Sequence, residues 1–328
     1  MLTNKVQWRK CQMRLREVQN AYKKAEITRF EANKLIMPVL DVLYDLSDLI
    51  KESCISKIEL DGTNIVFTIE YEKEQIKLCA EQGACISVVS NILATNTVEA
   101  ELEDNLYELI PENAVVFDIG ANIGWYSVCI AKHHPDVQVF SFEPIFYTFL
   151  YLKKNLQLNS LSTERIYNIG LSDENKQAIF YFNNKCTETS SMRDLKYIND
   201  ESQQIECKIR RLDDFCTEQK IDHVDFIKCD VEGAEFFVFR GGLGTIKKSR
   251  PVIFTEMLRK WSSAFDYHPN DIILLLASLD YVCIALNRNG KKRILMEVNE
   301  DTEEMNYLFI PQEKLAETVS KLKGFTNG

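Results

Sequence analysis

Glycines and an acidic residue follow an apolar stretch in V-V-F-D-I-G-A-N-I-G-W-Y, residues 115–126. This pattern predicts a strand that ends at Asp118, a turn at Gly120 and a helix that begins after Gly124. Such a turn lets the backbone approach a ligand closely, and the helix N-terminus offers free N–H groups. The dinucleotide fingerprint G-x-G-x-x-G is absent, because Asn122 stands at its second glycine. Asp118 would repel a pyrophosphate and attract a cationic ligand, and S-adenosylmethionine is such a ligand.

Carboxylates also end the later predicted strands. Glu143 ends the strand in F-S-F-E-P, where it can accept hydrogen bonds from both hydroxyls of a ribose, in NAD or in S-adenosylmethionine. The segment D-F-I-K-C-D-V-E-G-A-E, residues 225–235, brings Asp230 and Glu232 to the end of another strand, and P-V-I-F-T-E brings Glu256 to the same edge. Open α/β sheets bind ligands at this edge, so the sequence predicts an acidic crevice there.

The elements that must position these residues alternate between strand and helix from residue 114 onward. The predicted strands are 114–118, 137–142, 165–169, 224–229 and 251–255, with helices between most of them. This alternation predicts an α/β fold with a mostly parallel sheet and helices on both faces. Three further strand-like stretches, 177–182, 281–286 and 305–310, are expected to extend that sheet.

The first hundred residues have a different pattern of apolar and polar residues. Apolar and polar residues alternate over 57–79, with turns at 61–62 and 72–74, which predicts a small antiparallel β meander. Helical patterns precede it, including Leu35–Ile50, and another follows over Ile86–Ile110. We therefore divide the chain into an N-terminal accessory region, 1–100, and an α/β domain, 101–328.

The first helical segment carries apolar residues in heptad spacing: Trp8, Cys11, Leu15, Val18, Tyr22 and Ala25. This N-terminal helix can lie on its own domain, form the seam of a homo-oligomer, or present its basic face to an anionic partner. Residues 1–34 hold nine Lys/Arg against three Glu, whereas the whole chain has a net charge of −10. Apart from this segment, an acidic chain is a poor binder of nucleic acid.

The ten cysteines include no C-x-x-C pair, so neither a zinc site nor a disulfide framework is expected. Reduced thiols favour a cytoplasmic location. The charged N-terminus has no apolar signal-peptide core. The longest apolar run near the C-terminus, Ile272–Ala277, is too short to span a membrane.

The ordered set of motifs resembles the FkbM-type family of S-adenosylmethionine-dependent methyltransferases. The matching blocks are F-D-I-G-A-N-I-G-W-Y-S, F-E-P, N-I-G-L-S-D, S-S-M, R-L-D-D-F, F-I-K-C-D-V-E-G-A-E and R-P-V-I-F-T-E, in this order from about 114 to 256. The resemblance implies a class I methyltransferase (Rossmann-like) fold and S-adenosyl-L-methionine as cofactor. It also implies O-methylation of a hydroxyl, often on a sugar, glycan or secondary metabolite, as in carbohydrate or polysaccharide biosynthesis. The residues expected to hold the cofactor are Asp118, Gly120, Asn122, Gly124, Tyr126, Glu143, Pro144, Leu171 and Asp230.

Three residues are candidates for the base that takes the hydroxyl proton: Asp230, Glu232 and His268. His268 follows the fifth strand, on the expected ligand side, and an imidazole can accept a proton near neutral pH. The clustered carboxylates can instead bind Mg²⁺ with Glu256, but a cationic cofactor already explains them, so we expect no metal. Trp261 and Tyr267 either stack on a sugar or belong to the core. Ser190 and Ser191 either touch the ligands or form a plain loop.

Two other functions stay open. One is an RNA or nucleic-acid methyltransferase that uses the basic N-terminal helix; against it, D-V-E-G stands where amino-group methylases have N-P-P-[YF], and the catalytic region is acidic. The other is a non-catalytic scaffold with a relic cofactor fold, against which the intact cofactor motifs argue. Residues 1–100 match no motif of the family, and recognition of the acceptor can lie there as well as oligomerisation.

Overall fold

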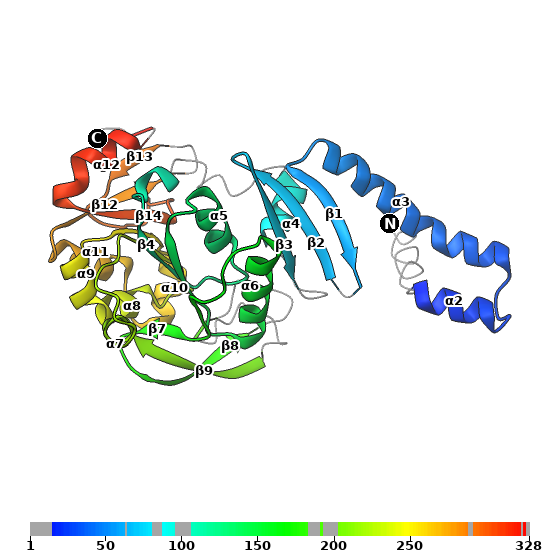
Figure 1. Cartoon of the computed structure of the whole chain (residues 1–328), viewed down its shortest axis with the longest axis horizontal. Coiled ribbons are helices and arrows are strands. Elements are labelled where there is room, and N and C mark those ends of the chain that lie inside the picture. The colour runs from blue at the N-terminus through cyan, green and yellow to red at the C-terminus, as the bar shows by residue number, and fades with distance from the viewer. Residues whose placement is uncertain are drawn as a thin grey trace.

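The computed structural model describes residues 15–62, 64–80, 87–95, 106–182, 191–192, 203–287, 291–322 and 324–325. Along its long axis, a helical arm, a small sheet and a larger α/β domain follow one another (Figure 1). Ser190, Trp8 and Cys11, which the sequence singles out, lie outside the described residues.

The domain is built on an eight-stranded sheet in the order β13-β12-β14-β11-β10-β4-β5-β6. Five strands are mutually parallel: β4 (Val115–Ile119), β5 (Gln138–Phe142), β6 (Ile166–Tyr167), β10 (Phe226–Cys229) and β11 (Val252–Glu256). Each lies within two residues of its predicted bounds. β14 (Asn306–Pro311) runs antiparallel to both β11 and β12 (Tyr281–Leu286), and β13 (Lys292–Ile294) closes the edge. The predicted α/β fold with a mostly parallel sheet is confirmed.

Helices cover both faces of this sheet, because successive strand residues point to opposite sides. Val116 packs with α5 (Trp125–His133) and α6 (Phe146–Leu158). Its neighbour Phe117 packs with the other face's helices, α7 (Leu212–Gln219), α8 (Glu235–Gly241), α9 (Leu243–Ser249) and α11 (Pro269–Ala277). Two short helices, α10 (Arg259–Ser262) and α12 (Leu315–Lys321), complete the described domain.

One predicted strand belongs to another sheet. The segment expected at 177–182 is β8 (Lys176–Phe182), which pairs with β9 (Gln203–Arg211) rather than with the main sheet. β7 (Gly170–Ser172) completes this three-stranded sheet. The prediction was wrong because Phe180 packs with Cys207 and Ile209 of β9, in a separate small core.

The predicted meander is confirmed as β1 (Ile55–Asp61), β2 (Asn64–Tyr71) and β3 (Glu74–Ala80), all antiparallel. Its turns fall at Gly62 and at Glu72–Lys73, where φ is positive, as expected of tight hairpins. The meander has no core of its own. Its buried side chains Ile69 and Ile76 belong to the same apolar cluster as α5 and α6.

Two asparagines of α6 attach β3 to the domain. The Asn155 Oδ1 accepts from the Cys79 N–H at 2.8 Å, and its Nδ2 donates to the Cys79 carbonyl at 3.1 Å. One turn later, Asn159 makes the same pair of bonds with Lys77, at 2.9 and 2.8 Å. The two amides thus occupy the place of a neighbouring strand beside β3. Residues four apart lie on one helix face, which explains the shared target.

The N-terminal helices form the arm. α2 (Leu15–Lys23) packs against α3 (Arg29–Lys51), which includes Pro38 and begins at the Thr28 capping box with Glu31. The predicted heptad seam does not extend to Ala25, because that residue follows the helix end with φ +57°. Of the expected helix over 86–110, the structure describes α4 (Ser87–Thr95) and a 3-10 turn, Tyr107–Leu109.

Among the described residues, no helix is long and apolar enough to cross a bilayer. The seven cysteines that the structure describes are free of disulfide bonds. The cytoplasmic location stays a prediction.

Candidate functional site

The turn between β4 and α5 forms one wall of a cavity of about 250 Å³ at the carboxyl ends of the parallel strands. Gly120 has φ +76°, and a Cβ there would lie 1.8 Å from the Asp230 carbonyl oxygen. Gly124, at φ +93°, caps α5 and packs on Leu152. Both positions therefore require glycine, and the close contact with residue 230 brings two distant motifs together.

Asp118 lies fully buried beneath this turn. Its Oδ2 accepts a hydrogen bond from the Ser127 hydroxyl. Its Oδ1 has no hydrogen-bond partner among the described residues but lies 3.6 Å from the Lys228 Nζ. Burial raises the pKa of Asp118, and the Lys228 ammonium opposes that rise.

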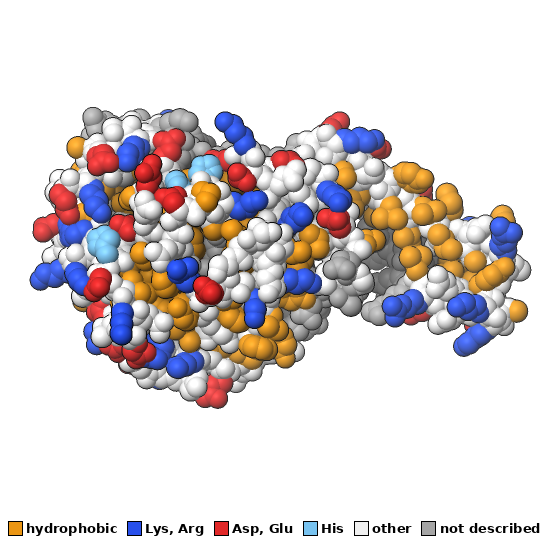
Figure 2. All heavy atoms as spheres, in the orientation of Figure 1, with side chains coloured by type: hydrophobic (Ala, Val, Ile, Leu, Met, Phe, Trp, Pro, Cys, Tyr) orange, Lys and Arg blue, Asp and Glu red, His pale blue; other side chains and the backbone are white. Residues whose placement is uncertain are grey.

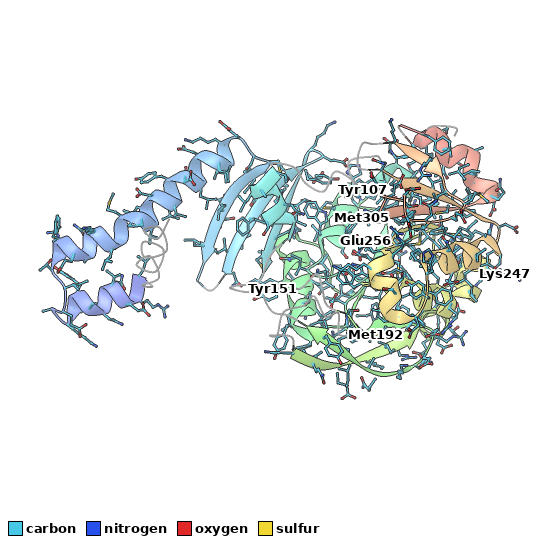
Figure 3. All side chains as sticks on the ribbon, turned by 180° about the vertical axis from the view of Figure 1, so that it is seen from behind. Tyr107, Tyr151, Met192, Lys247, Glu256 and Met305 are labelled. Atoms are coloured by element: carbon cyan, nitrogen blue, oxygen red, sulfur yellow. The ribbon has the colours of Figure 1, made fainter. Side chains whose placement is uncertain are left out.

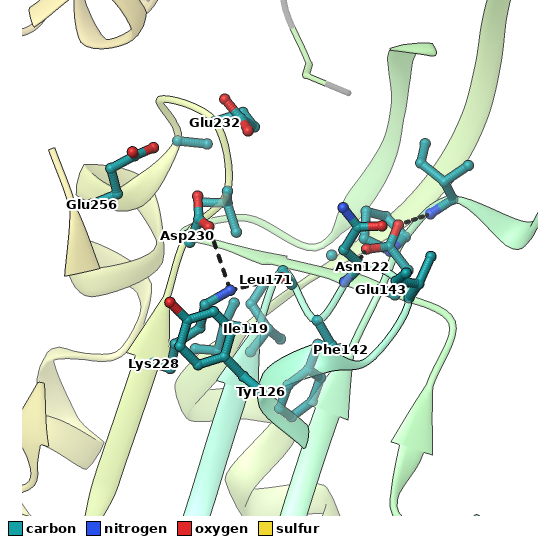
Figure 4. A pocket seen from close by; sticks show the side chains of 18 of the residues that line it. Ile119, Asn122, Tyr126, Phe142, Glu143, Leu171, Lys228, Asp230, Glu232 and Glu256 are labelled. Atoms are coloured by element: carbon teal, nitrogen blue, oxygen red, sulfur yellow. Dashed lines mark hydrogen bonds and ion pairs between the residues drawn. The ribbon is translucent and has the colours of Figure 1, made fainter. Parts of the chain in front are cut away.

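Glu143 closes the far end of the cavity, where Figure 4 shows it beside Asn122. Its carboxylate accepts from the Asn122 N–H at 3.0 Å and from the Ile145 N–H at 2.8 Å. Burial raises the pKa of Glu143 to about 7, while these backbone donors act in the opposite direction. Pro144, Leu171 and the other lining residues make this end mostly apolar, as suits a nucleoside.

Lys228 is the site residue that sequence reasoning missed. It sits in β10, almost fully buried, with its Nζ 3.6 Å from Asp118 and 3.5 Å from Asp230 (Figure 4). The ammonium also donates to the Gly120 carbonyl at 2.9 Å and lies 4.8 Å from the centroid of the Tyr126 ring. A lysine inside a short, otherwise apolar strand was the available signal, since a buried lysine needs paired charges.

The Glu235 side chain fixes the conformation of the turn after β10. Glu232 and Gly233 adopt positive φ, +55° and +97°. The Glu235 carboxylate accepts from the Val231 and Gly233 N–H groups at 3.0 and 3.1 Å. Burial raises the pKa of Glu235 to about 7. Sequence reasoning did not single out Glu235, although it fixes the backbone that presents Asp230 and Glu232.

Three carboxylates line the opposite end of the cavity: Asp230, Glu232 and Glu256. In Figure 4 the Glu256 side chain lies on the far side of Asp230 from Glu143, and the Glu232 side chain lies above Asp230. Seen from behind, Glu256 at the end of β11 lies near Met305, whose carbonyl accepts from the Met257 N–H (Figure 3). The described residues contain no group of three His, Cys, Asp or Glu side chains arranged to hold a metal ion.

The structure brings most of the predicted site residues to this cavity. Its lining includes Gly120, Asn122, Tyr126, Glu143, Pro144, Leu171, Asp230 and Glu232. Asp118 and Gly124 lie behind the lining and support it.

His268 is not brought to the cavity. Its ring is the N-cap of α11, and its Nδ1 accepts from the Asn270 N–H at 3.2 Å. The side chain is exposed and is not among the residues that line the cavity. The capping signal in Y-H-P-N-D accounts for the histidine, because Pro269 and Asp271 complete a helix N-terminus.

The two aromatic candidates also have structural contacts. Tyr267 donates its hydroxyl to Glu235 at 3.2 Å, and the backbone of Trp261 packs against Gly233. Ser191 donates its hydroxyl to the Glu232 carbonyl at 3.1 Å. All three contacts support the turn after β10.

Comparison with known proteins gives a consistent picture. The family model described as the methyltransferase FkbM domain matches residues 118–283. The chain is 32% identical to the 2-O-methyltransferase NoeI of Sinorhizobium fredii over 154 residues, which cover 43% of this chain and 62% of NoeI. It is 26% identical to Methyltransferase 1 of Beauveria bassiana over 156 residues, which cover 42% of this chain and 63% of that protein. The matches thus span about three fifths of the length of these two relatives.

Among solved structures, the methyltransferase FkbM of Methylobacillus flagellatus aligns with a TM-score of 0.40 and 14% identity, covering 70% of this chain and 56% of that one. The family model is the decisive finding, since it spans half of the chain and contains Asp118, Glu143 and Asp230. This chain therefore belongs to the FkbM methyltransferase family.

Proposed function

We propose that this protein is an S-adenosylmethionine-dependent O-methyltransferase that acts on a hydroxyl of a sugar, glycan or secondary-metabolite acceptor. The observation that carries the proposal is the distribution of charge in the cavity. Asp118 and Asp230 share one ammonium, that of Lys228, so the cluster retains one net negative charge. A cationic ligand neutralises that charge.

The residues fit the cofactor at two further points. The Asn122 and Asp230 side chains, which line the cavity, each contain a buried oxygen without a hydrogen-bond partner among the described residues. Buried oxygens of this kind normally have a donor, so a ligand that supplies donors satisfies them. Glu143 lies where it would accept from the ribose hydroxyls, and Leu171 would flank the base.

When bound, the cofactor supplies an electrophilic methyl group on a positively charged sulfur. The protein contributes alignment of the acceptor hydroxyl with that methyl group and exclusion of water. Asp230 lies in the cavity with one carboxylate oxygen 3.5 Å from Lys228. We assign to Asp230 the removal of the hydroxyl proton. A general base such as Asp230 contributes roughly 10²–10⁴-fold to the rate. Glu232 and Glu256 would orient the acceptor by accepting hydrogen bonds from its other hydroxyls, a contact suited to polyhydroxylated molecules.

The 2-O-methyl transfer in the name of the Sinorhizobium relative supports a hydroxyl acceptor, because NoeI is 32% identical to this chain over 154 residues.

Calorimetric titration of the full chain with S-adenosylmethionine tests the proposal. We expect saturable binding that Glu143→Gln weakens by about 10–100-fold, the effect of losing one hydrogen-bonded charge. Gly120→Val should abolish it, because the side chain would collide with the Asp230 carbonyl. Glu164→Gln, an exposed glutamate away from the cavity, is the control. Absence of binding heat, or equal affinities for all variants, would refute the proposal.

A screen of hydroxylated acceptors, read by the formation of S-adenosylhomocysteine, tests the reaction itself. Asp230→Asn should reduce turnover by at least about 10²-fold with any acceptor found. Cofactor binding without turnover on any acceptor would favour the non-catalytic alternative.

A further inference from the structure

The arm carries more apolar surface than its described contacts cover. α3 has 23 residues, which corresponds to a length of about 35 Å. Within α2 and α3 only Val18 and Ala32 are buried. In Figure 2 the arm shows apolar side chains along much of its visible face. Its exposed large apolar residues on α3 are Phe30, Met37, Leu40, Val42, Leu43, Tyr44 and Leu49.

One face of α3 has the spacing of a coiled-coil seam. Ala32, Leu35, Val39, Val42, Leu46 and Leu49 are separated by three, four, three, four and three residues. α2 packs on the arm where Ala32 is buried, whereas Val42 and Leu49 are 65% and 43% exposed. Helices gain most of their stability from packing an apolar face, so this seam requires a cover along its second half.

The distribution of charge along the arm indicates which partner can cover the exposed part of the seam. Residues 15–39 carry five Lys/Arg and three Glu, whereas residues 40–52 carry four Asp/Glu and one Lys. A parallel copy of the arm would place like charges beside each other. An antiparallel copy places the basic part of each arm beside the acidic part of the other.

The positions of the seam residues also fit an antiparallel pair. In an antiparallel pair related by a two-fold axis between residues 40 and 41, Val39 faces Val42 of the second copy. In the same register Leu35 faces Leu46, and Leu49 faces the first turns of α3, where Ala32 is already buried. The four central seam residues, Leu35, Val39, Val42 and Leu46, thus meet one another across the axis, as an isologous contact requires. We propose that α3 pairs antiparallel with α3 of a second copy of this chain, and that the protein is a homodimer joined through its arms.

Sedimentation equilibrium of the full chain across the micromolar range tests this assignment. We expect a particle of twice the 38.0 kDa chain mass. Val42→Glu, which places a charge in the seam, should raise the dimer dissociation constant at least about 100-fold. Tyr44→Glu is the matched control, because Tyr44 is 72% exposed and lies two residues away, off the seam. It should leave the dimer intact.

Neither substitution touches the cavity, so both variants should keep the wild-type affinity for S-adenosylmethionine and the wild-type circular dichroism. This separates loss of the dimer from misfolding and from failure of the proposed function. A monomeric wild-type chain would overturn the inference. A monomer whose arm binds a labelled RNA would overturn it too, and would point to a nucleic-acid partner instead. Dissociation by Tyr44→Glu but not by Val42→Glu would overturn the seam.

Cysteine cross-linking tests the direction of the pair. Leu35→Cys and Leu46→Cys should each form no new cross-linked dimer alone, because in the antiparallel pair equal positions lie about 16 Å apart along the axis. A mixture of the two variants should form one on oxidation, with the wild-type chain as control for its native thiols. Cross-linking of either variant with itself would show a parallel pair and refute the assignment.

Discussion

Glu143 is a buried carboxylate that also accepts hydrogen bonds from the backbone. It is buried, which raises its pKa to about 7, and it already accepts two backbone N–H groups that hold the glycine turn and the start of α6. Its protonation state thus changes within the range in which enzymes are assayed. Ribose hydroxyls donate best to the ionised carboxylate, so cofactor binding and ionisation of Glu143 should be linked.

We predict that the affinity for S-adenosylmethionine falls as the pH is lowered from 8 to 6. The folded protein holds a proton on Glu143 below about pH 7, and binding must release it, which reduces affinity by up to about tenfold per pH unit. Calorimetry at several pH values, in buffers of different ionisation enthalpy, measures both the affinity and the released proton.

Glu143→Gln provides the comparison, since it binds more weakly but cannot titrate. Glu235 also has a pKa of about 7, and it remains in this variant. If Glu143→Gln retains the full pH dependence, the linkage belongs to Glu235 or to another group.

Lys228 is predicted to stabilise the site mainly by pairing buried charges. Lys228→Met would leave Asp118 buried without its ammonium and Asp230 without its ion pair. Breaking a buried pair on one side typically destabilises a protein by about 3–5 kcal/mol. Urea unfolding near pH 7 should show a loss of this size, whereas Lys247→Met, an exposed lysine of α9, should change little.

The same substitution is informative at low pH. Without the ammonium the pKa of Asp118 should rise further, so the unfolding free energy of Lys228→Met should approach that of the wild type as the pH falls and the carboxyl groups are protonated. A constant difference between pH 5 and pH 8 would contradict the charge-pairing role.

At the scale of elements, α6 links the meander to the turn between β4 and α5. Besides its bonds to Cys79, the Asn155 Nδ2 donates to the Ile123 carbonyl at 2.8 Å. Asn159 makes the equivalent bonds to Lys77 but has no bond to the turn between β4 and α5. Substitution of each asparagine in turn can therefore separate attachment of the meander from support of the turn between β4 and α5.

We predict that Asn155→Ala and Asn159→Ala each destabilise the protein by about 2–4 kcal/mol, because each leaves buried backbone groups without partners. Only Asn155→Ala should also weaken binding of S-adenosylmethionine. Thermal unfolding gives the first quantity and calorimetry below the unfolding temperature gives the second. An equal loss of affinity in both variants would show that α6 supports the turn as a whole.

The sequence reveals those elements that have a clear pattern of apolar and polar residues. Four of the five parallel strands are short apolar runs with an acidic residue at or beside the end, so Asp118, Glu143, Asp230 and Glu256 were all placed at one edge from sequence alone. β9 was missed because only Ile205, Cys207 and Ile209 are apolar in a charged segment.

Side-chain roles within the site were less predictable. His268 was put forward for its chemistry, yet the local capping geometry determines its place. The pairing of Lys228 with two carboxylates from different strands depends on the sheet order, which no single motif encodes. The asparagines of α6 gave no signal, because their partners lie 76 and 82 residues away along the chain.

At the scale of the whole molecule, the boundary between 1–100 and 101–328 stays a prediction. The packing indicates that the meander, although it lies before this boundary, shares its core with the domain. The meander residues Ile55, Ile69 and Leu78 are fully buried in one cluster with Val116 and Val128 of the domain. Separation of the two parts would expose this cluster. A small three-stranded sheet without its own core is not stable alone.

We therefore predict that the meander and the methyltransferase domain unfold as one unit, while the arm is independent of them. Hydrogen exchange should give the amides of β2 and β3 the same protection as those of β4 and β10, since opening any of them requires global unfolding. The amides of α3 should exchange much faster in Val42→Glu than in the wild type, with no change in the meander. Early exchange of β2 and β3, before β4, would instead show that the accessory region is a separately stable module.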